Sequence, residues 1–212
     1  MFARFIAAVA AMVVVVTASN ILVQYPVQFD LGPIHLADIL TWGAFTYPFA
    51  FLVSDLTNRY DGARQARFVV LAGFVVGLAL SFYLSTPRIA IATGSAFLIG
   101  QLLDIAVFQR LRNRYWLVPP LSASLFGSLL DTAIFFSLAF APAFGLVDTW
   151  FGAADTSLGM AAPWLGLGAP VPLWLSLASG DFSVKFLAAL LLLAPYRLLM
   201  GAMVRPGATA AG

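Results

Sequence analysis

Five ionisable side chains lie inside long apolar stretches of this sequence, namely Asp55, Asp104, Asp131, Asp181 and Lys185. Buried carboxylates and a buried ammonium group can bind a polar ligand through ionic hydrogen bonds, or they can hold and release a proton. A charge at the centre of a membrane helix costs about 2.5 to 3.5 kcal/mol, so such residues usually have a binding or transport role. We therefore treat these five residues as candidate functional residues.

Three of these charges lie at mid-membrane depth, together with two amides. At 1.5 Å per residue, Asp131 lies roughly 20 Å and Asp181 roughly 15 Å inside their apolar stretches. Asn20, Gln101 and Lys185 fall at comparable levels. Asp181 and Lys185 are spaced i, i+4, which allows them to neutralise each other on one helix. A ligand-contacting pair is the alternative that we favour, and the pattern predicts a polar chamber.

Asp55 and Asp104 lie closer to the ends of their stretches that we predict to be cytoplasmic. They form a second acidic tier below the predicted chamber. They are candidates for a gating or coupling role, for example as proton carriers. For Asp55, an ion pair at the helix end with a loop arginine such as Arg59 is an equal alternative.

Aromatic and small polar residues complete the predicted chamber. Trp42 and Phe45 lie on one face of the second apolar stretch and are candidates for stacking on a flat ligand, with plain packing as the alternative. Asn20 and Ser128 have an alternative role as hydrogen-bonding bridges between helices.

The elements that must position these residues are membrane helices. The chain has 212 residues, of which 62% are hydrophobic and only 9% charged, against about 25% charged in soluble domains. A helix needs about 20 apolar residues to cross a bilayer. The hydrophobic pattern predicts an all-α membrane protein, a single domain over 1–212 that is a bundle of six transmembrane helices at about 5–25, 39–56, 68–86, 89–109, 117–141 and 171–200.

The arginines predict the orientation of this bundle, because short cytoplasmic loops retain Lys and Arg. With both termini cytoplasmic, nine of the eleven basic residues fall on the inner side and only Arg88 on the outer side. The first stretch resembles a signal peptide, with Arg4 before it and the small residue Ala18 after it. Its removal would place basic segments on the wrong side, so we interpret it as a membrane span.

Several function classes are excluded. A net charge of +2 gives no basic patch for nucleic acid, and no cysteine is present. The sole lysine lies outside any phosphate-loop motif, and the sole histidine, His35, lies in a predicted loop, so no intramembrane Ser-His dyad can form. A metal site from His35, Asp30 and Asp38 is weakly supported, and we predict no metal, no cofactor and no enzyme activity.

Two further features concern contacts between helices and the longest loop. Small-residue ridges occur at Ala3, Ala7 and Ala11 and at Gly73 and Gly77; internal packing is one interpretation and a homodimer contact is the other. The nearly apolar third span is the candidate lipid-facing or dimer surface. The outer loop at 142–170 is interpreted as an interfacial segment, with a gating lid as the alternative.

Short segments along almost the whole chain resemble the queuosine precursor transporter family of the vitamin uptake superfamily, which is related to the substrate-binding components of energy-coupling-factor transporters. The segments are ASNILV (18–23), DLTNR (55–59), GQLLD (100–104), FG with DT (126–132) and DFSVKF (181–186). The resemblance implies a multi-pass importer of the cell inner membrane for 7-cyano-7-deazaguanine and 7-aminomethyl-7-deazaguanine.

A deazaguanine offers two N–H donors on one edge, an O6 acceptor and two faces for stacking. The resemblance therefore predicts that Asp131 or Asp181 accepts from the N1/N2 edge, while Lys185 or Gln101 donates to O6. Asn20 would contact a remaining edge, and Phe45 or Trp42 would stack. Transport would be passive, ion-coupled or driven by a separate ATPase module. The alternatives are a vitamin-binding component for another planar substrate and a membrane scaffold protein.

Overall fold

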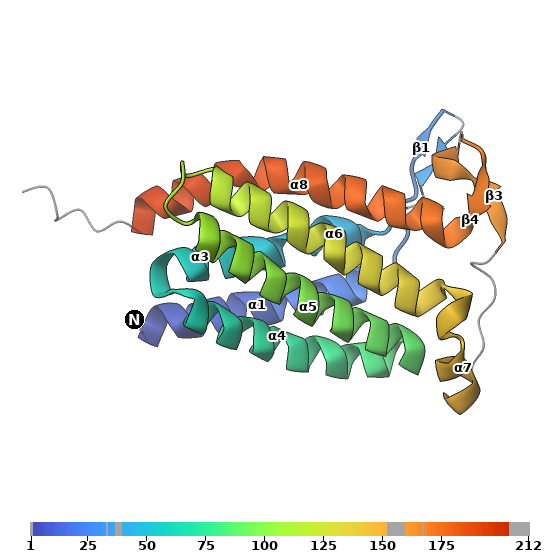
Figure 1. Cartoon of the computed structure of the whole chain (residues 1–212), viewed down its shortest axis with the longest axis horizontal. Coiled ribbons are helices and arrows are strands. Elements are labelled where there is room, and N and C mark those ends of the chain that lie inside the picture. Colours follow the sequence, from blue (N-terminus) through green and yellow to red (C-terminus); the bar gives the residue numbers. More distant parts are fainter. Residues whose placement is uncertain (1, 33, 37–39, 152–159, 167, 204–212) are drawn as a thin grey trace, which may run out of the picture.

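The computed structural model describes residues 2–32, 34–36, 40–151, 160–166 and 168–203. The helices are α1 (Phe2–Leu22), α2 (Trp42–Thr46), α3 (Pro48–Asp61), α4 (Ala63–Leu84), α5 (Pro87–Leu111), α6 (Val118–Phe140), α7 (Leu146–Phe151) and α8 (Leu173–Met203). Two antiparallel hairpins pair β1 (Asp30–Leu31) with β2 (Ile34–His35) and β3 (Ala161–Pro163) with β4 (Pro170–Pro172). Figure 1 shows the long helices side by side as a bundle, with the strands and α7 at one end, here called the hairpin end.

Five of these helices, α1, α4, α5, α6 and α8, are long and apolar enough to cross a membrane. The all-α membrane class is therefore confirmed. The second predicted span differs, because the chain there forms the short α2 and then α3, with Tyr47 between them. Pro48 is the first residue of α3, and a proline has no N–H to continue the helix before it. The crossing of the bilayer by α2 and α3 together remains a prediction.

The basic segments meet at the other end of the bundle, here called the basic end. Arg4 of α1 forms an ion pair with Asp61 at the end of α3, at 2.8 Å. Arg59 donates to the carbonyl of Arg112, and Arg112 donates to that of Arg59, at 2.8 and 2.9 Å. Tyr60 donates to the carbonyl of Met200 at 2.6 Å. The predicted gathering of arginines at one end is therefore observed, whereas Asp38, Asp155 and Arg205 lie outside the described residues.

Glycines allow the helices to approach closely. A Cβ on Gly73 or Gly77 of α4 would come within 2.6 or 2.7 Å of the side chains of Met12 and Val16 of α1. This ridge therefore serves internal packing. The alanine ridge formed by Ala3, Ala7 and Ala11 is exposed on α1.

Polar contacts hold the hairpin end together. The side chain of Arg88, at the start of α5, donates to the carbonyls of Leu138 and Ala141 at 2.8 and 2.7 Å, where α6 ends and its last carbonyls lack helical partners. In the outer loop, Trp164 Nε1 donates to Ser179 Oγ of α8 at 2.9 Å. The part of this loop around Trp164 is thereby attached to α8.

Candidate functional site

A cavity of about 820 Å³, including its open mouth, runs from the hairpin end into the bundle. Gln24, Thr41 and Ser85 line it near the hairpin end, and Asp131 and Lys185 line it deeper in the bundle. Its polar lining also includes Ser19, Asn20, Tyr47, Ser81, Thr93 and Asp181.

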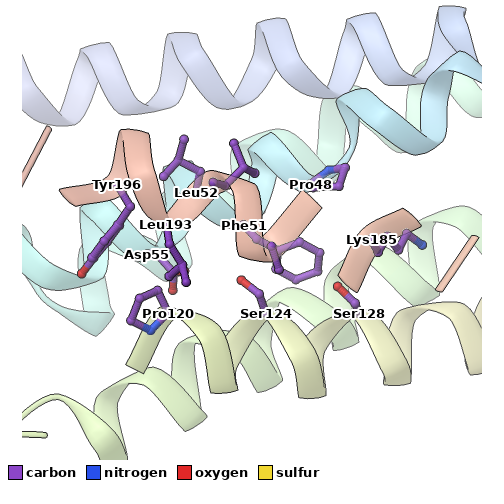
Figure 2. Close-up of a pocket in the computed structure, with 12 residues that line it drawn as sticks. Pro48, Phe51, Leu52, Asp55, Pro120, Ser124, Ser128, Lys185, Leu193 and Tyr196 are labelled. Carbon is purple, nitrogen blue, oxygen red and sulfur yellow. The ribbon is translucent and has the colours of Figure 1, made fainter. Parts of the chain in front are cut away.

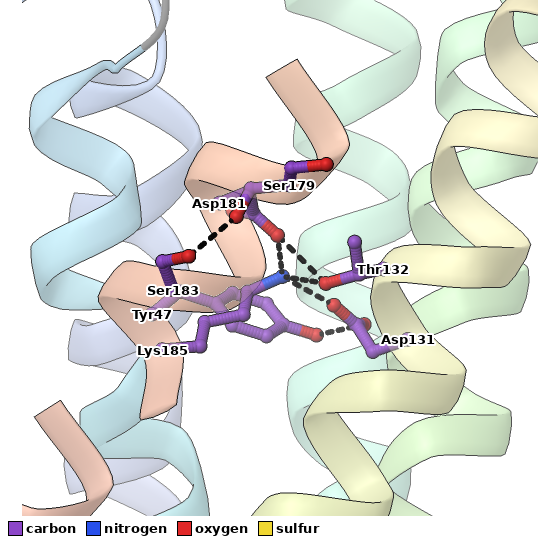
Figure 3. A network of polar contacts seen from close by, with 7 residues as sticks. All are labelled: Tyr47, Asp131, Thr132, Ser179, Asp181, Ser183 and Lys185. Carbon is purple, nitrogen blue, oxygen red and sulfur yellow. Dashed lines mark hydrogen bonds and ion pairs between the residues drawn. The ribbon is translucent and has the colours of Figure 1, made fainter. Parts of the chain in front are cut away.

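Three charged residues form an ion-pair cluster at the base of this cavity. Lys185 Nζ lies 2.7 Å from Asp131 Oδ2 and 2.6 Å from Asp181 Oδ2. Figure 3 shows Lys185 between the two carboxylates, which come from α6 and from its own helix α8. The sequence pairing of Asp181 with Lys185 is therefore observed, but Asp131 is a second partner.

Two neutral side chains complete this charged cluster. Tyr47 Oη donates to Asp131 Oδ1 at 2.6 Å, and its ring lies 4.9 Å from Lys185 Nζ in a cation–π contact. Thr132 Oγ1 donates to Asp181 Oδ2 at 2.8 Å and lies 3.3 Å from Lys185 Nζ. The lysine thus has three oxygen acceptors, which match the three N–H donors of an ammonium group.

The two carboxylates differ in how available they are to a ligand. The side chain of Asp131 is 5% exposed and both its oxygens are engaged, one by Tyr47 and one by Lys185. The side chain of Asp181 is 19% exposed, and its described partners all contact Oδ2. Asp181 Oδ1 is therefore the carboxylate oxygen best placed to accept hydrogen bonds from a molecule in the cavity.

Local backbone features place these side chains. Tyr47 lies between α2 and α3, has helical dihedrals (φ −56°, ψ −39°) and donates its N–H to the carbonyl of Gly43. Asp131 is held by a close contact of α5 with α6, because a Cβ on Gly100 would lie 2.9 Å from the Asp131 Cβ and 3.1 Å from the carbonyl of Gly127. Only a residue without a side chain fits at position 100 without a shift of the neighbouring backbone.

The two predicted amides lie in different surroundings. Asn20 lines the cavity, donates to the carbonyl of Val16 at 2.9 Å and accepts from Ser81 of α4 at 2.7 Å. It therefore bridges α1 and α4 as well as facing the cavity. Gln101 is fully buried outside the residues that line the cavity, and neither polar atom of its side chain has a hydrogen-bond partner among the described residues.

The predicted stacking residues face outward. Trp42 and Phe45 are 50% and 40% exposed, they contact each other at 5.8 Å between ring centroids, and neither lines the cavity. The aromatic side chains that do line it are Tyr47 and Phe135. Phe135 belongs to the helical stripe that contains Asp131 and is the better-placed stacking surface.

The acidic tier lies farther toward the basic end. Asp55 of α3 and Asp104 of α5 are 2% and 0% exposed, and their carboxyl groups are close neighbours. Ser54 Oγ donates to Asp104 Oδ2 at 3.2 Å. The alternative of an ion pair between Asp55 and Arg59 is not observed, because Arg59 contacts the carbonyl of Arg112 instead.

Within the described ranges, no group of three or more His, Cys, Asp or Glu side chains is close enough to hold a metal ion. Asp30 and His35 are paired in the register of the β1–β2 hairpin, while Asp38 lies outside these ranges.

Sequence reasoning missed Tyr47 and Thr132 as members of the charged cluster. The signal for Tyr47 was the following proline, which has no N–H for the helical hydrogen-bond ladder, although Tyr47 itself keeps helical dihedrals (φ −56°, ψ −39°). Thr132 directly follows Asp131, and no helical spacing marks it as facing Asp181.

Comparison with known proteins gives two findings. A family model described as "Putative vitamin uptake transporter" matches residues 41–86 and 80–199. The chain is 37% identical over 147 residues to the "Queuosine precursor transporter" of Escherichia coli, covering 59% of this chain and 64% of the relative. It is 35% identical over 153 residues to the "Probable queuosine precursor transporter" of Haemophilus influenzae, covering 59% of this chain and 65% of the relative.

The matched region thus spans a little less than two thirds of the length of each of these relatives. No solved structure matches the chain significantly.

Proposed function

The chain belongs to this family of vitamin uptake transporters, and from that membership we propose that it is an importer of queuosine precursors, 7-cyano-7-deazaguanine and 7-aminomethyl-7-deazaguanine. The observation that carries the proposal is the ion-pair cluster at the base of the deep cavity. An enzyme role is not supported, because the relatives are named as transporters.

The cavity offers partners for each part of a deazaguanine. The N1 and N2 hydrogens of the base require an acceptor that takes both, and Asp181 Oδ1 supports this role because it has no described hydrogen-bond partner. The O6 atom requires a donor, which Lys185 supplies if one of its three acceptors gives way. Asn20, which also lines the cavity, can contact a remaining edge of the base, and the Phe135 ring can stack on its face.

The proposal assigns four residues roles that differ from those expected from the sequence, namely Asp131, Gln101, Trp42 and Phe45. Asp131 positions Lys185, because both its oxygens are already engaged. Gln101 is a packing neighbour with unused donors and acceptors, and direct donation to O6 would need it to move. Trp42 and Phe45 would need to rotate inward to stack, so Phe135 replaces them as the preferred stacking residue.

The charge of the cluster favours one of the two precursors. Two carboxylates and one ammonium group leave a net charge of −1 at the base of the cavity. The aminomethyl precursor carries a cationic amine, whereas the cyano precursor is neutral. Attraction between opposite charges in partly buried surroundings supports tighter binding of the aminomethyl compound.

The proposed orientation has both termini on the cytoplasmic side of the inner membrane, with six crossings of the bilayer. It rests on the arginines that gather at the basic end. In this orientation the cavity opens to the outside, as an importer requires in its substrate-accepting state. A homodimer would use the exposed face of α4, where Phe68, Val75 and Phe82 are 48%, 63% and 48% exposed, because the glycine ridge faces α1.

Uptake by variants of the purified chain in liposomes tests the proposal. We expect Asp181→Asn to lose most uptake of both precursors, and Asp131→Asn to lose it through displacement of Lys185. Asp61→Asn, which changes the ion pair between the buried Asp61 carboxylate and the exposed Arg4 at the basic end and does not touch the cavity lining, is the matched control and should retain uptake. Normal uptake with unchanged affinity in both Asp131→Asn and Asp181→Asn would contradict the assignment.

The same experiment separates the proposal from its competitor. A substrate-binding component that depends on an ATPase module would bind the precursor but would not accumulate it when reconstituted alone. We expect the purified chain to transport without any added subunit.

A further inference from the structure

The acidic tier near the basic end contains two buried carboxyl groups without a compensating cation. The carboxyl groups of Asp55 and Asp104 are close neighbours, Ser54 Oγ donates to Asp104 Oδ2 at 3.2 Å, and Ser124 lies beside Asp55. Among the described residues, no Lys or Arg forms an ion pair with either carboxyl group. Two ionised carboxylates this close together and this deeply buried would repel each other strongly, which favours a proton shared between them.

Other groups with charge or a titratable proton face this pair from the surrounding helices. Tyr196 of α8 lies near Asp55 and is 1% exposed. Arg59 and Tyr60 lie one turn farther along α3, and both are engaged with backbone carbonyls at the basic end. None of the three supplies an ion pair to the carboxyl groups.

Several polar atoms around this acidic pair lack a hydrogen-bond partner. They are Asp55 Oδ1, Asp104 Oδ1, Asn58 Oδ1 and Tyr196 Oη, and all are shielded from solvent. A buried polar atom that stays unsatisfied is costly. Polar atoms with unused hydrogen-bonding capacity are thus concentrated around the acidic pair.

A small cavity lies between this region and Lys185 of the ion-pair cluster. It is lined by Tyr196 and Asp55 at one end and by Lys185 at the other, with Ser124 and Ser128 of α6 between them. Figure 2 shows Asp55, Ser124, Ser128 and Lys185 following one another along it, with both serine hydroxyls turned inward. The cavity has room for about one water molecule. Lys185 therefore borders both this cavity and the larger one open at the hairpin end.

From this arrangement we propose that the Asp55–Asp104 pair is a proton site, which the serines, one water molecule and the ion-pair cluster connect to the substrate cavity, and that uptake is coupled to inward proton movement. The inference rests on the proposed function, and it adds the coupling ion and its path. At rest the pair shares one proton and carries one negative charge. An O–H bond forms on the ionised carboxylate when a second proton arrives from the cavity, and it breaks when that proton leaves at the basic end.

A metal cation is a poorer occupant of this site. A bound cation needs several oxygen ligands around it, whereas leucine, proline and phenylalanine form much of the cavity wall. A proton needs only the two carboxyl groups that are already in contact.

The test uses the full chain in liposomes that contain a pH-sensitive dye. With the outside more acidic by about one pH unit, we expect wild-type uptake of 7-aminomethyl-7-deazaguanine to rise several-fold, with dye acidification that depends on substrate and disappears with a protonophore. Asp55→Asn and Asp104→Asn should bind the precursor within about twofold of wild type and lose this stimulation. Asp61→Asn should keep it.

The milder Ser124→Ala variant guards against loss of folding in the carboxyl variants. It should fold, bind normally and show reduced stimulation, because it removes one hydroxyl from the path. Wild-type uptake that ignores the pH gradient, or that follows a sodium gradient instead, would overturn the inference while leaving the proposed function intact. Retained stimulation in Asp55→Asn and Asp104→Asn would also overturn it, and absence of any wild-type uptake would overturn both proposals.

Discussion

Two groups of buried charge lie along the same bundle, and they are neutralised in different ways. In the ion-pair cluster, Lys185 faces Asp131 and Asp181 at 2.7 and 2.6 Å, and Thr132 and Tyr47 occupy further acceptor and donor positions. In the acidic tier, Asp55 and Asp104 face each other and leave an oxygen each without a partner.

The difference is informative because the two groups are so close. Asp104 follows Gly100 by four residues on α5, which is about 6 Å along a helix, and Gly100 contacts Asp131. One group holds a cation between its two carboxylates and borders the larger cavity, as a binding site should. The other lacks a positive charge and borders space for about one water molecule, as a proton site should. In this account the ion-pair cluster recognises the substrate and the acidic tier couples transport to protons, a division of labour between the two groups.

Removal of Lys185 should have the largest effect on stability and on precursor binding. Lys185→Met leaves two buried carboxylates without their cation, which should lower the free energy of unfolding by roughly 3 to 5 kcal/mol. Thermal denaturation in detergent would measure the loss, and precursor binding should disappear. Lys185→Arg keeps the charge and should lose less stability.

A triple variant completes this experiment. Lys185→Met combined with Asp131→Asn and Asp181→Asn removes every charge of the cluster, so stability should recover while binding stays absent. Recovered binding in the triple variant would show that the cluster is only structural.

Variants at the close contact between α5 and α6 should distinguish the ion-pair cluster from the acidic tier most clearly. A Cβ on Gly100 would lie 2.9 Å from the Asp131 Cβ, whereas a Cβ on Gly127 would lie 3.1 Å from the Asp104 Cβ and 2.9 Å from the ring of Phe51. Each alanine variant should destabilise the protein by about 1 to 3 kcal/mol through overpacking.

The readouts of the two variants should differ. Gly100→Ala should weaken precursor binding more, and Gly127→Ala should reduce the pH-gradient stimulation more. Gly201→Ala, which meets no atom within 4 Å, is the control for both. Equal effects of Gly100→Ala and Gly127→Ala on binding and on stimulation would argue against a division of labour.

Removal of the Tyr47 hydroxyl should have a smaller effect, and it changes only one hydrogen bond of the cluster. Tyr47→Phe removes the 2.6 Å hydrogen bond to Asp131 and keeps the ring that faces Lys185. A hydrogen bond to a charged group contributes about 1.5 to 3 kcal/mol, so we expect precursor affinity to fall about tenfold in a calorimetric titration. An unchanged affinity would mean that Asp131 does not need this partner to hold Lys185.

The smallest effects should come from the outward-facing aromatic residues. Trp42→Ala and Phe45→Ala should change precursor affinity less than twofold, because both side chains face away from the cavity. Phe135→Ala should weaken it by about 1 to 3 kcal/mol if the base stacks there. Equilibrium binding measures all three, and the reverse order would restore the stacking role predicted for Trp42 and Phe45.

Much of the architecture could be predicted from hydrophobicity and charge. Long apolar stretches correspond to α1, α4, α5, α6 and α8, since a bilayer-crossing helix has to satisfy its backbone internally. The i, i+4 spacing also predicted the contact of Asp181 with Lys185. These are local properties, which sequence spacing records directly.

The features that the sequence did not predict depend on how the helices are rotated and packed against one another. Asp131 and Lys185 are 54 residues apart, and no local pattern pairs them. Helical spacing placed Trp42 and Phe45 on one face but could not tell that this face points outward. Tyr47, between α2 and α3, lines the cavity instead of these aromatic residues.

The most direct test of the central claim is equilibrium binding of both precursors and guanine to the purified protein and to Asp181→Asn, with Asp55→Asn as the matched control. The account predicts that wild type binds both precursors, with the aminomethyl compound tighter than the cyano compound and tighter than guanine. It also predicts that Asp181→Asn loses most of this affinity while Asp55→Asn keeps it. Equal affinity of wild type and Asp181→Asn for the precursors, or no binding to wild type, would contradict the account.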